Sequence, residues 1–337
     1  MASGAESSRP VVSVVIPVYN EGEGLDALWK ELAPVLDELD SAGRRPAVVF
    51  VDDGSQDDSL ERLKKLAAAD GRVRVVELLF NSGQHAAVAA GMREARGDAV
   101  VTLDADLQNP PSEIPKIAGK VLEGFDMVSG IRAGRRDTVF RRMAGFFSTR
   151  IVSYSTGIRL SDYGSMLRGY SREVAREVAE AFQPGTYIPA VAYVYSKRRV
   201  EIETSHAERA HGRSKYGLKG LLRLHADIMT GFSVLPLRLA ALAGCLSALM
   251  GTGLAAYILV RRHFEGDAFT AQGVFTLFAI AFLFMGVQMV ALSVLGEYVG
   301  RIYNYGRRRP RHVIRAIHTG AGSAAPKDDA GDGEDAS

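Results

Sequence analysis

The chain has 337 residues and a formal net charge of +2, which gives enough length for two ordinary domains and too little charge to predict a nucleic-acid partner. Its single cysteine, Cys245, excludes a disulfide framework and a zinc cluster built on cysteines, and its seven histidines show no HExxH zinc-protease spacing. Residues 1–10 are polar with no apolar core, and we interpret them as a flexible N-terminus rather than a signal peptide.

Five apolar segments alternate with helical patterns through the first 130 residues or so. These predicted strands are Val11–Val18, Ala47–Val51, Val73–Leu79, Ala99–Leu103 and Met127–Ile131. The alternation predicts an α/β domain over residues 11–232, with a mostly parallel sheet covered by helices. Ligands of such sheets bind outside the carboxyl ends of the strands.

Polar residues follow the first three predicted strands. The three segments are Pro17-Val18-Tyr19-Asn20-Glu21, Asp52-Asp53-Gly54-Ser55-Gln56-Asp57 and Asn81-Ser82-Gly83-Gln84-His85. Carboxylates can accept hydrogen bonds from a base or a ribose, and an aromatic ring can stack on a base. Singly, each segment has an ordinary explanation, because Asp-Gly-Ser is a common turn and Asp57 a common helix N-cap. Together they predict a nucleotide site, although neither GxGxxG nor GKS/T is present for a dinucleotide or P-loop site.

The fourth strand ends in two carboxylates. Its exit reads Asp104-Ala105-Asp106-Leu107-Gln108-Asn109-Pro110-Pro111. Both carboxylates can face a divalent cation that carries phosphate oxygens, and we predict Asp106 as the ligand of Mg²⁺ or Mn²⁺. The alternative is an acidic loop that caps a helix, since we expect Ser112 to be the N-cap of a helix beginning at Glu113. For His85, donor positioning or helix capping is favoured over general base.

Residues 137–157 have the pattern of an amphipathic helix. Its apolar face comprises Val139, Phe140, Met143, Phe146, Phe147, Ile151 and Tyr154, with arginines elsewhere. This pattern fits a helix on a membrane surface, and a core-packing helix with a solvated basic face is the alternative. Residues 214–232 are a second candidate for such an interfacial helix.

Two long apolar runs follow, at about residues 236–260 and 274–296. Each exceeds the roughly 20 residues that cross a bilayer, and two buried helices of a soluble protein are the alternative. Lysines and arginines flank the pair on both sides, which places both flanks in the cytoplasm. We therefore predict a transmembrane hairpin over residues 233–300, a basic cytosolic segment at 301–317 and a disordered tail at 318–337.

Four segments carry a resemblance to a known family. They are Val15-Ile16-Pro17-Val18-Tyr19-Asn20-Glu21, Val51-Asp52-Asp53-Gly54-Ser55, the Asp104–Pro111 segment, and Arg209-x-x-Gly212-x-Ser214-Lys215. In combination they resemble the family 2 glycosyltransferases that load a sugar onto a polyprenyl phosphate, and the match extends over about residues 11 to 315. The resemblance implies a GT-A catalytic domain, an inverting transfer from a nucleotide sugar, a membrane hairpin and a homo-tetramer.

Further segments are most similar to the members that transfer 4-deoxy-4-formamido-L-arabinose from UDP to undecaprenyl phosphate, in lipid A modification and antibiotic resistance. These segments are Gly83-Gln84-His85, Asp162-Tyr163-Gly164-Ser165-Met166-Leu167-Arg168, His206-Ala207-Glu208-Arg209 and Leu295–Tyr303. The chain departs from that pattern at Ser165, Gly145 and Phe80-Asn81-Ser82. A glucosyl or mannosyl transferase to a polyprenyl or dolichyl phosphate therefore stays the alternative.

The resemblance also implies roles for individual residues. The nucleotide base is surrounded by Pro17, Tyr19, Glu21 and Asp53. Ribose, diphosphate and metal lie at Asp104 and Asp106. The loop that closes over the donor carries Arg209, Ser214 and Lys215. The acceptor phosphate is bound by Arg132 and Arg141, and the donor is positioned by Gln84 and His85. These roles imply catalysis at the cytoplasmic face of a bacterial inner membrane, with both termini cytoplasmic.

Three other classes of protein were weighed. A processive polysaccharide synthase carries a QxxRW segment after the donor domain, but the only tryptophan here is Trp29, within the first helical pattern. A non-catalytic membrane adaptor or lipid-carrier subunit is disfavoured by the intact Asp-x-Asp and Arg-x-x-Gly-x-Ser-Lys segments. A soluble nucleotidyltransferase would lack the membrane hairpin.

Overall fold

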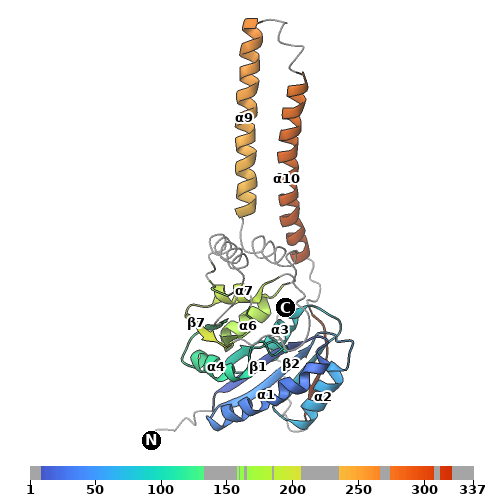
Figure 1. The fold of residues 1–337 in the computed structure, drawn as a ribbon, viewed down its shortest axis with the longest axis vertical. Helices are drawn as coiled ribbons and strands as arrows, with labels where there is room; N and C mark the ends of the chain where they lie inside the picture. Colours follow the sequence, from blue (N-terminus) through green and yellow to red (C-terminus); the bar gives the residue numbers. More distant parts are fainter. Residues whose placement is uncertain are drawn as a thin grey trace, which may run out of the picture. The chain divides into compact units, whose positions relative to one another are not determined.

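The computed structural model describes residues 9–132, 158, 160–162, 165–183, 186–205, 235–265, 274–306 and 312–320. The chain divides into two units. The first comprises Met1–Asp137, Leu160–Arg213 and Pro310–Ser337, and the second comprises Thr138–Arg159 and Ser214–Arg309. The two interfacial helices expected at residues 137–157 and 214–232 lie outside the described residues. Figure 1 labels the elements of each unit.

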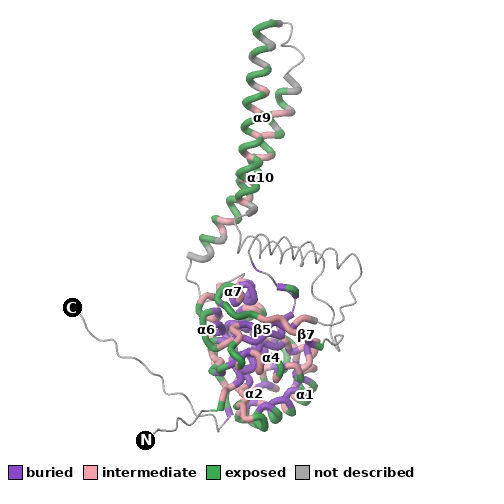
Figure 2. Tube along the Cα trace, turned by 90° about the vertical axis from the view of Figure 1, so that its left-hand side faces the viewer, coloured by how far each residue is buried: buried purple, intermediate pink, exposed green. Residues whose placement is uncertain are grey.

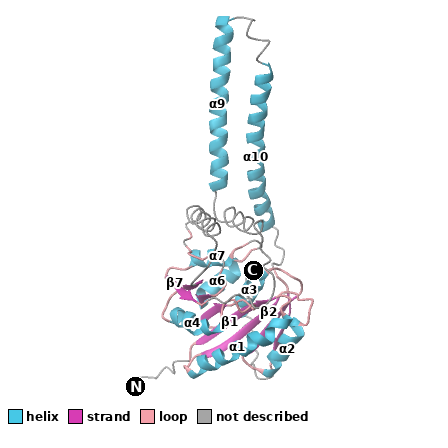
Figure 3. Ribbon diagram, viewed as in Figure 1, coloured by secondary structure: helices cyan, strands magenta, loops and turns pink. Residues whose placement is uncertain are grey.

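The first unit is built on an eight-stranded sheet with the order β7-β5-β6-β4-β1-β2-β3-β8 (Figure 3). The strands are β1 (Val11–Val18), β2 (Arg45–Asp52), β3 (Val73–Leu78), β4 (Ala99–Thr102), β5 (Met127–Arg132), β6 (Arg168–Ser171), β7 (Arg199–Thr204) and β8 (Ile314–Thr319). Strands β1 to β4 run parallel to one another, as β5 and β7 do, whereas β6 and β8 are antiparallel to their neighbours. The five predicted strands are thus confirmed.

Helices cover both faces of this sheet (Figure 1). They are α1 (Gly22–Ser41), α2 (Ser59–Ala69), α3 (Gln84–Glu94), the 3-10 turn η1 (Pro111–Glu113), α4 (Ile114–Leu122), α6 (Arg172–Ala181) and α7 (Ile188–Tyr195). The expected N-cap at Ser112 is wrong. Ser112 lies inside η1, because the two prolines begin a 3-10 turn, and the N-cap of α4 is Glu113.

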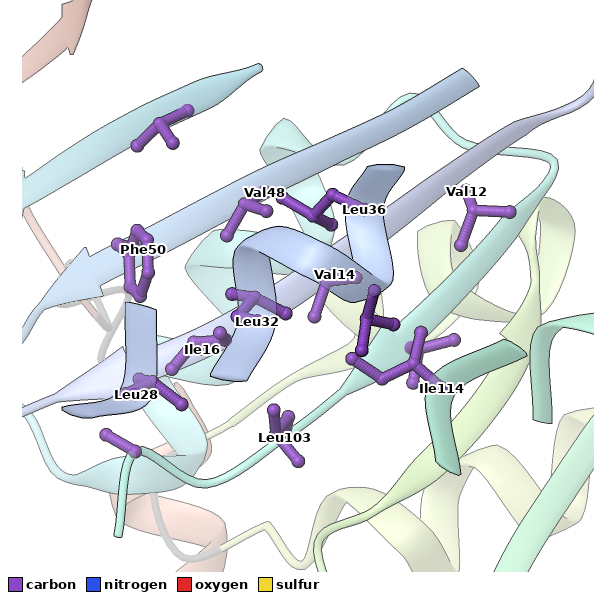
Figure 4. Packing of buried hydrophobic residues seen from close by; sticks show 14 of the residues in the cluster. Val12, Val14, Ile16, Leu28, Leu32, Leu36, Val48, Phe50, Leu103 and Ile114 are labelled. Carbon is purple, nitrogen blue, oxygen red and sulfur yellow. The ribbon is translucent and has the colours of Figure 1, made fainter. Parts of the chain in front are cut away.

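The core lies between the sheet and α1 (Figure 4). Side chains alternate across a strand, so Val12, Val14 and Ile16 of β1 all face the same side and are completely buried. Helix α1 presents Leu28, Leu32 and Leu36 to them at a spacing of four residues, which places these leucines on one helical face. Figure 2 shows that the buried residues gather in this sheet and its covering helices.

On the opposite face, α3 packs closely against the sheet. A Cβ atom on Gly91 would lie 2.3 Å from Val15 Cγ1 and 2.9 Å from Val51 Cγ2, so only glycine allows this approach. The close packing fixes the N-terminus of α3, with Gln84 and His85, at the carboxyl ends of the strands.

Strand β8 was not predicted. The sequence analysis assigned its residues to the basic segment and to the start of the disordered tail at residue 318. Instead, Ile314–Thr319 pairs antiparallel with β3 at the edge of the sheet. The reason is a partner strand far away in the sequence, which short-range patterns do not reveal. Strands β6 and β7 were missed as well.

The second unit contains two long apolar helices, α9 (Leu235–Glu265) and α10 (Val274–Gly306), of 31 and 33 residues. The windows Leu237–Leu254 and Leu283–Gly300 have a mean hydropathy of 1.5, and none of their residues is buried. Both helices are long and apolar enough to cross a membrane. They pack against each other where Gly251 lies beside the Phe284 ring, since a Cβ at Gly251 would be 3.2 Å from Phe284 Cζ.

Candidate functional site

The loops that follow β1, β2, β3 and β4 meet at one edge of the sheet, because these four strands are parallel. We call these loops, residues 19–21, 53–58, 79–83 and 103–110, the rim. The first two are joined by hydrogen bonds: Asn20 N donates to Ser55 Oγ at 3.1 Å, and Gln56 N donates to Asn20 Oδ1 at 2.7 Å. Asn20 adopts a left-handed φ of 54°, a conformation often found at functional sites. Its neighbours Tyr19 and Glu21 are thereby held at the rim.

Asp57 joins the first turns of two helices. Its Oδ2 accepts from Gly22 N of α1 at 3.1 Å, and its Oδ1 accepts from Ser59 N of α2 at 3.0 Å. Burial raises the pKa of Asp57, but the hydrogen bonds from Ser59 and Gly22 outweigh burial and leave the pKa below its ordinary value. The expected capping role is therefore present, and it extends to a second helix.

Replacing Asp57 by alanine is expected to lower the free energy of unfolding by about 1–2 kcal/mol at pH 7. Because the folded-state pKa is depressed, this stabilisation is complete above the ordinary value near 3.9 and is lost as the pH falls through the folded-state pKa. Urea denaturation followed by the fluorescence of Trp29 measures it, since Trp29 packs on the core. The control is Asp58→Ala, which removes an exposed ion pair with Arg62. Equal losses in the two variants would contradict the prediction.

Asp53 holds the loop that follows β3. It is 2% exposed, and its Oδ1 and Oδ2 accept from the backbone amides of Ser82 at 2.7 Å and Gly83 at 2.9 Å. Burial raises the pKa of Asp53 above its ordinary value despite these bonds. The next residue, Gly54, has a φ of 68°, and a Cβ there would lie 2.8 Å from Asn81 N. The second and third rim loops are thus packed backbone against backbone.

The fourth loop is connected to α3. Gln84 Nε2 donates to Asp104 Oδ1 at 2.6 Å, and Asp106 Oδ1 accepts from Gln108 N at 3.1 Å across a left-handed Leu107. The structure therefore brings both carboxylates to the rim beside Gln84, and both are half-buried. Among the described residues, no cluster of three or more histidine, cysteine or acidic side chains could hold a metal ion.

His85 is kept neutral by its surroundings. Burial lowers the pKa of its imidazole to about 4, and the charge of Arg168 contributes to the shift. Its ring meets the Tyr187 ring edge to face, with 5.4 Å between centroids. A group with so low a pKa is a weak base at neutral pH, so the geometry favours a positioning role.

The sequence analysis missed the part played by Arg168. This side chain is completely buried, and it donates to Ser165 O at 2.9 Å, Ser129 Oγ at 2.7 Å and Asp162 O at 2.6 Å. It therefore ties the segment before β6 to β5. The available signal was the position of Arg168 at the end of the Asp162–Arg168 motif.

The remaining predicted residues are placed as follows. Pro17 lies in β1 opposite Val51. Arg132 is the last residue of β5, and its side chain is not among those described. The other candidates lie outside the described residues, namely Arg141, Arg209, Ser214 and Lys215.

Comparisons with known proteins agree with the motifs. Residues 13–179 match the family model described as Glycosyl transferase family 2. The chain is 44% identical over 307 residues to undecaprenyl-phosphate 4-deoxy-4-formamido-L-arabinose transferase of Edwardsiella ictaluri, which covers 91% of this chain and 94% of that protein. The Klebsiella pneumoniae protein of the same name is 41% identical over 319 residues, which cover 94% of this chain and 97% of the relative.

A solved structure is similar at a greater distance. Glucosyl-3-phosphoglycerate synthase from Mycobacterium tuberculosis, in complex with Mn²⁺, UDP-glucose and phosphoglyceric acid, is 20% identical with a TM-score of 0.47. The similarity covers 66% of this chain and 78% of that one. The resemblance drawn from the sequence motifs is confirmed by the curated relatives, and the α/β fold with its mostly parallel sheet is GT-A-like. The chain belongs to glycosyl transferase family 2.

Proposed function

We propose that this glycosyltransferase transfers 4-deoxy-4-formamido-L-arabinose from UDP to undecaprenyl phosphate at the cytoplasmic face of the bacterial inner membrane, in lipid A modification. The observation that carries the proposal is the 44% identity to relatives of that name along nearly the whole chain. Helices α9 and α10, as a transmembrane hairpin, would hold the enzyme in the bilayer that contains the acceptor.

The rim supplies oxygen ligands suited to Mg²⁺ or Mn²⁺. Mg²⁺ is commonly held by only one or two carboxylates together with substrate phosphates, so Asp104 and Asp106 fit without a third protein ligand. Asp106 is the proposed ligand. When bound, the ion would supply charge neutralisation at the diphosphate of the donor.

The rim residues would hold the donor for in-line attack. Pro17, Tyr19 and Glu21 face the base, and Asp53 shapes that site by holding Ser82 and Gly83. A phosphate oxygen of the lipid forms a bond to the anomeric carbon, the bond from that carbon to UDP breaks, and the configuration inverts. The conserved chemistry of the closing loop, with Arg209, Ser214 and Lys215, would stabilise the charge on UDP. The acceptor is already an anion near neutral pH, so the reaction needs no strong base, in keeping with a neutral His85.

The acceptor phosphate is assigned to Arg132 and Arg141. Replacing Arg132 by alanine is expected to raise the KM for undecaprenyl phosphate about tenfold or more, because a charge-assisted hydrogen bond to a phosphate is lost. The KM for the nucleotide sugar should stay within about twofold. Steady-state rates in nanodiscs measure both constants, with Arg142→Ala as the control. A larger effect on the donor KM would count against the assignment.

The proposed function is tested with the full chain in nanodiscs that contain undecaprenyl phosphate. UDP-4-deoxy-4-formamido-L-arabinose, UDP-glucose and GDP-mannose are offered separately, and the lipid product is weighed by mass spectrometry. The expected result is the formamido-arabinosyl lipid phosphate alone. A hexosyl product, or none from any donor, would overturn the proposal.

A further inference from the structure

Glu77 is a buried carboxylate near the carboxyl end of β3, and it is 6% exposed. Two side chains of β8 contact it: Arg315 Nη1 lies 3.3 Å from Oε1, and His318 Nε2 lies 2.9 Å from Oε2. Lys64 of α2 adds a third positive charge, with Nζ 3.8 Å from Oε2. Burial raises the pKa of Glu77, but the bonds from His318 and Arg315 and the charge of Lys64 outweigh burial, so the pKa lies below its ordinary value.

The opposite neighbour of Glu77 is acidic. Asp52 of β2 pairs with Glu77 in register, and both carboxylates are buried. Burial is the largest cause that raises the pKa of Asp52, and the charge of Glu77 raises it further. The cations of β8 and α2 therefore balance two carboxylates at the edge of the rim.

The pairing of β8 with β3 continues into the third rim loop. Leu79 N donates to Val313 O at 2.8 Å, and the ladder shifts register between Glu77 and Leu78. Such bulges are frequent next to active sites. The same loop then donates two backbone amides to Asp53 and leads into Gln84, which bonds Asp104. A continuous path of hydrogen bonds thus links β8 to the carboxylates of the proposed nucleotide site.

We infer that Glu77 is a positioning residue: its ion pairs with Arg315 and His318 clamp β8 against β3 and thereby fix residues 79–84 at the donor side of the rim. The inference rests on the proposed nucleotide site. It also gives the segment after α10 a role in donor binding, because Arg315 and His318 follow that helix in the chain.

The test uses the full chain in nanodiscs and the variant Glu77→Gln, which keeps the shape of the side chain and removes its charge. Hydrogen exchange of residues 79–84 is measured without ligand, and UDP binding is measured by calorimetry. We expect faster exchange and a five- to tenfold higher Kd for UDP, a typical size for coupling between neighbouring sites. The KM for undecaprenyl phosphate should stay within about twofold. The double variant Arg315→Ala/His318→Ala should act in the same direction from the other strand.

The matched control is Glu94→Gln. It removes a partly buried ion pair between Arg74 and Glu94, 3.3 Å apart, at the opposite end of β3. If the two variants affected loop exchange and UDP affinity alike, general stability would explain the result and the inference would be overturned. Unchanged exchange and affinity in Glu77→Gln would also overturn it. A wild-type protein that binds UDP but transfers no sugar would refute the proposed function alone, since the exchange measurement needs neither sugar nor lipid.

Discussion

Replacing Asp106 by alanine is expected to lower kcat/KM by about 10²–10³-fold while the protein still inserts into membranes. Asp106 stands on the loop after β4, and its Oδ1 accepts from Gln108 N, which orients the carboxylate at the rim. The proposed role is to hold the divalent ion at the donor diphosphate, where negative charge grows as UDP leaves. Rates measured over a Mn²⁺ titration should rise with metal for the wild type and hardly at all for the variant.

A matched control separates this effect from the loss of any surface carboxylate. Asp26 pairs with Arg62 on the exposed side of α1, at 2.7 Å, so Asp26→Ala should leave both the rate and its Mn²⁺ dependence unchanged. Chelation of divalent ions should bring the wild-type rate down to the level of Asp106→Ala. Full turnover by Asp106→Ala would refute the metal assignment.

The first five strands could be predicted because their sequences are nearly continuous apolar runs, as buried parallel strands require. Strand β6 reads Arg-Gly-Tyr-Ser, and its buried arginine conceals it from such a pattern. Strand β7 alternates polar and apolar residues over only six positions, and β8 depends on a partner more than 230 residues away. Patterns along the chain report burial, whereas strand pairing over such distances depends on the whole fold.

The location of the site was predictable for a similar reason. Parallel strands place their carboxyl ends together, so Tyr19, Asp53 and Asp104 had to share one edge. The contacts among the loops were not predictable. Asp53 holds two amides about 30 residues further along the chain, and Gln84 reaches Asp104 because α3 packs closely on Gly91. Such contacts depend on the distances between loops, which residue types alone do not specify.

Arg168 carries the second large expected effect. Its guanidinium donates to two backbone carbonyls and one hydroxyl in the interior, and methionine can replace its length but none of its donors. Each buried acceptor left unpaired costs about 1–3 kcal/mol, so Arg168→Met should lower the free energy of unfolding by about 3 kcal/mol or more. A lysine should rescue little, because one ammonium cannot reproduce the planar fork.

Urea denaturation followed by Trp29 fluorescence measures the loss, and Arg172→Met is the matched control. Arg172 begins α6 and is 53% exposed, with Nη2 3.1 Å from Asp98 Oδ1, so its replacement should cost no more than about 1 kcal/mol. A comparable loss in both variants would mean that burial at position 168 adds nothing. A selective loss would establish that the Asp162–Arg168 motif depends on its buried cation, because the donor that holds the carbonyls of Asp162 and Ser165 lies within the motif itself.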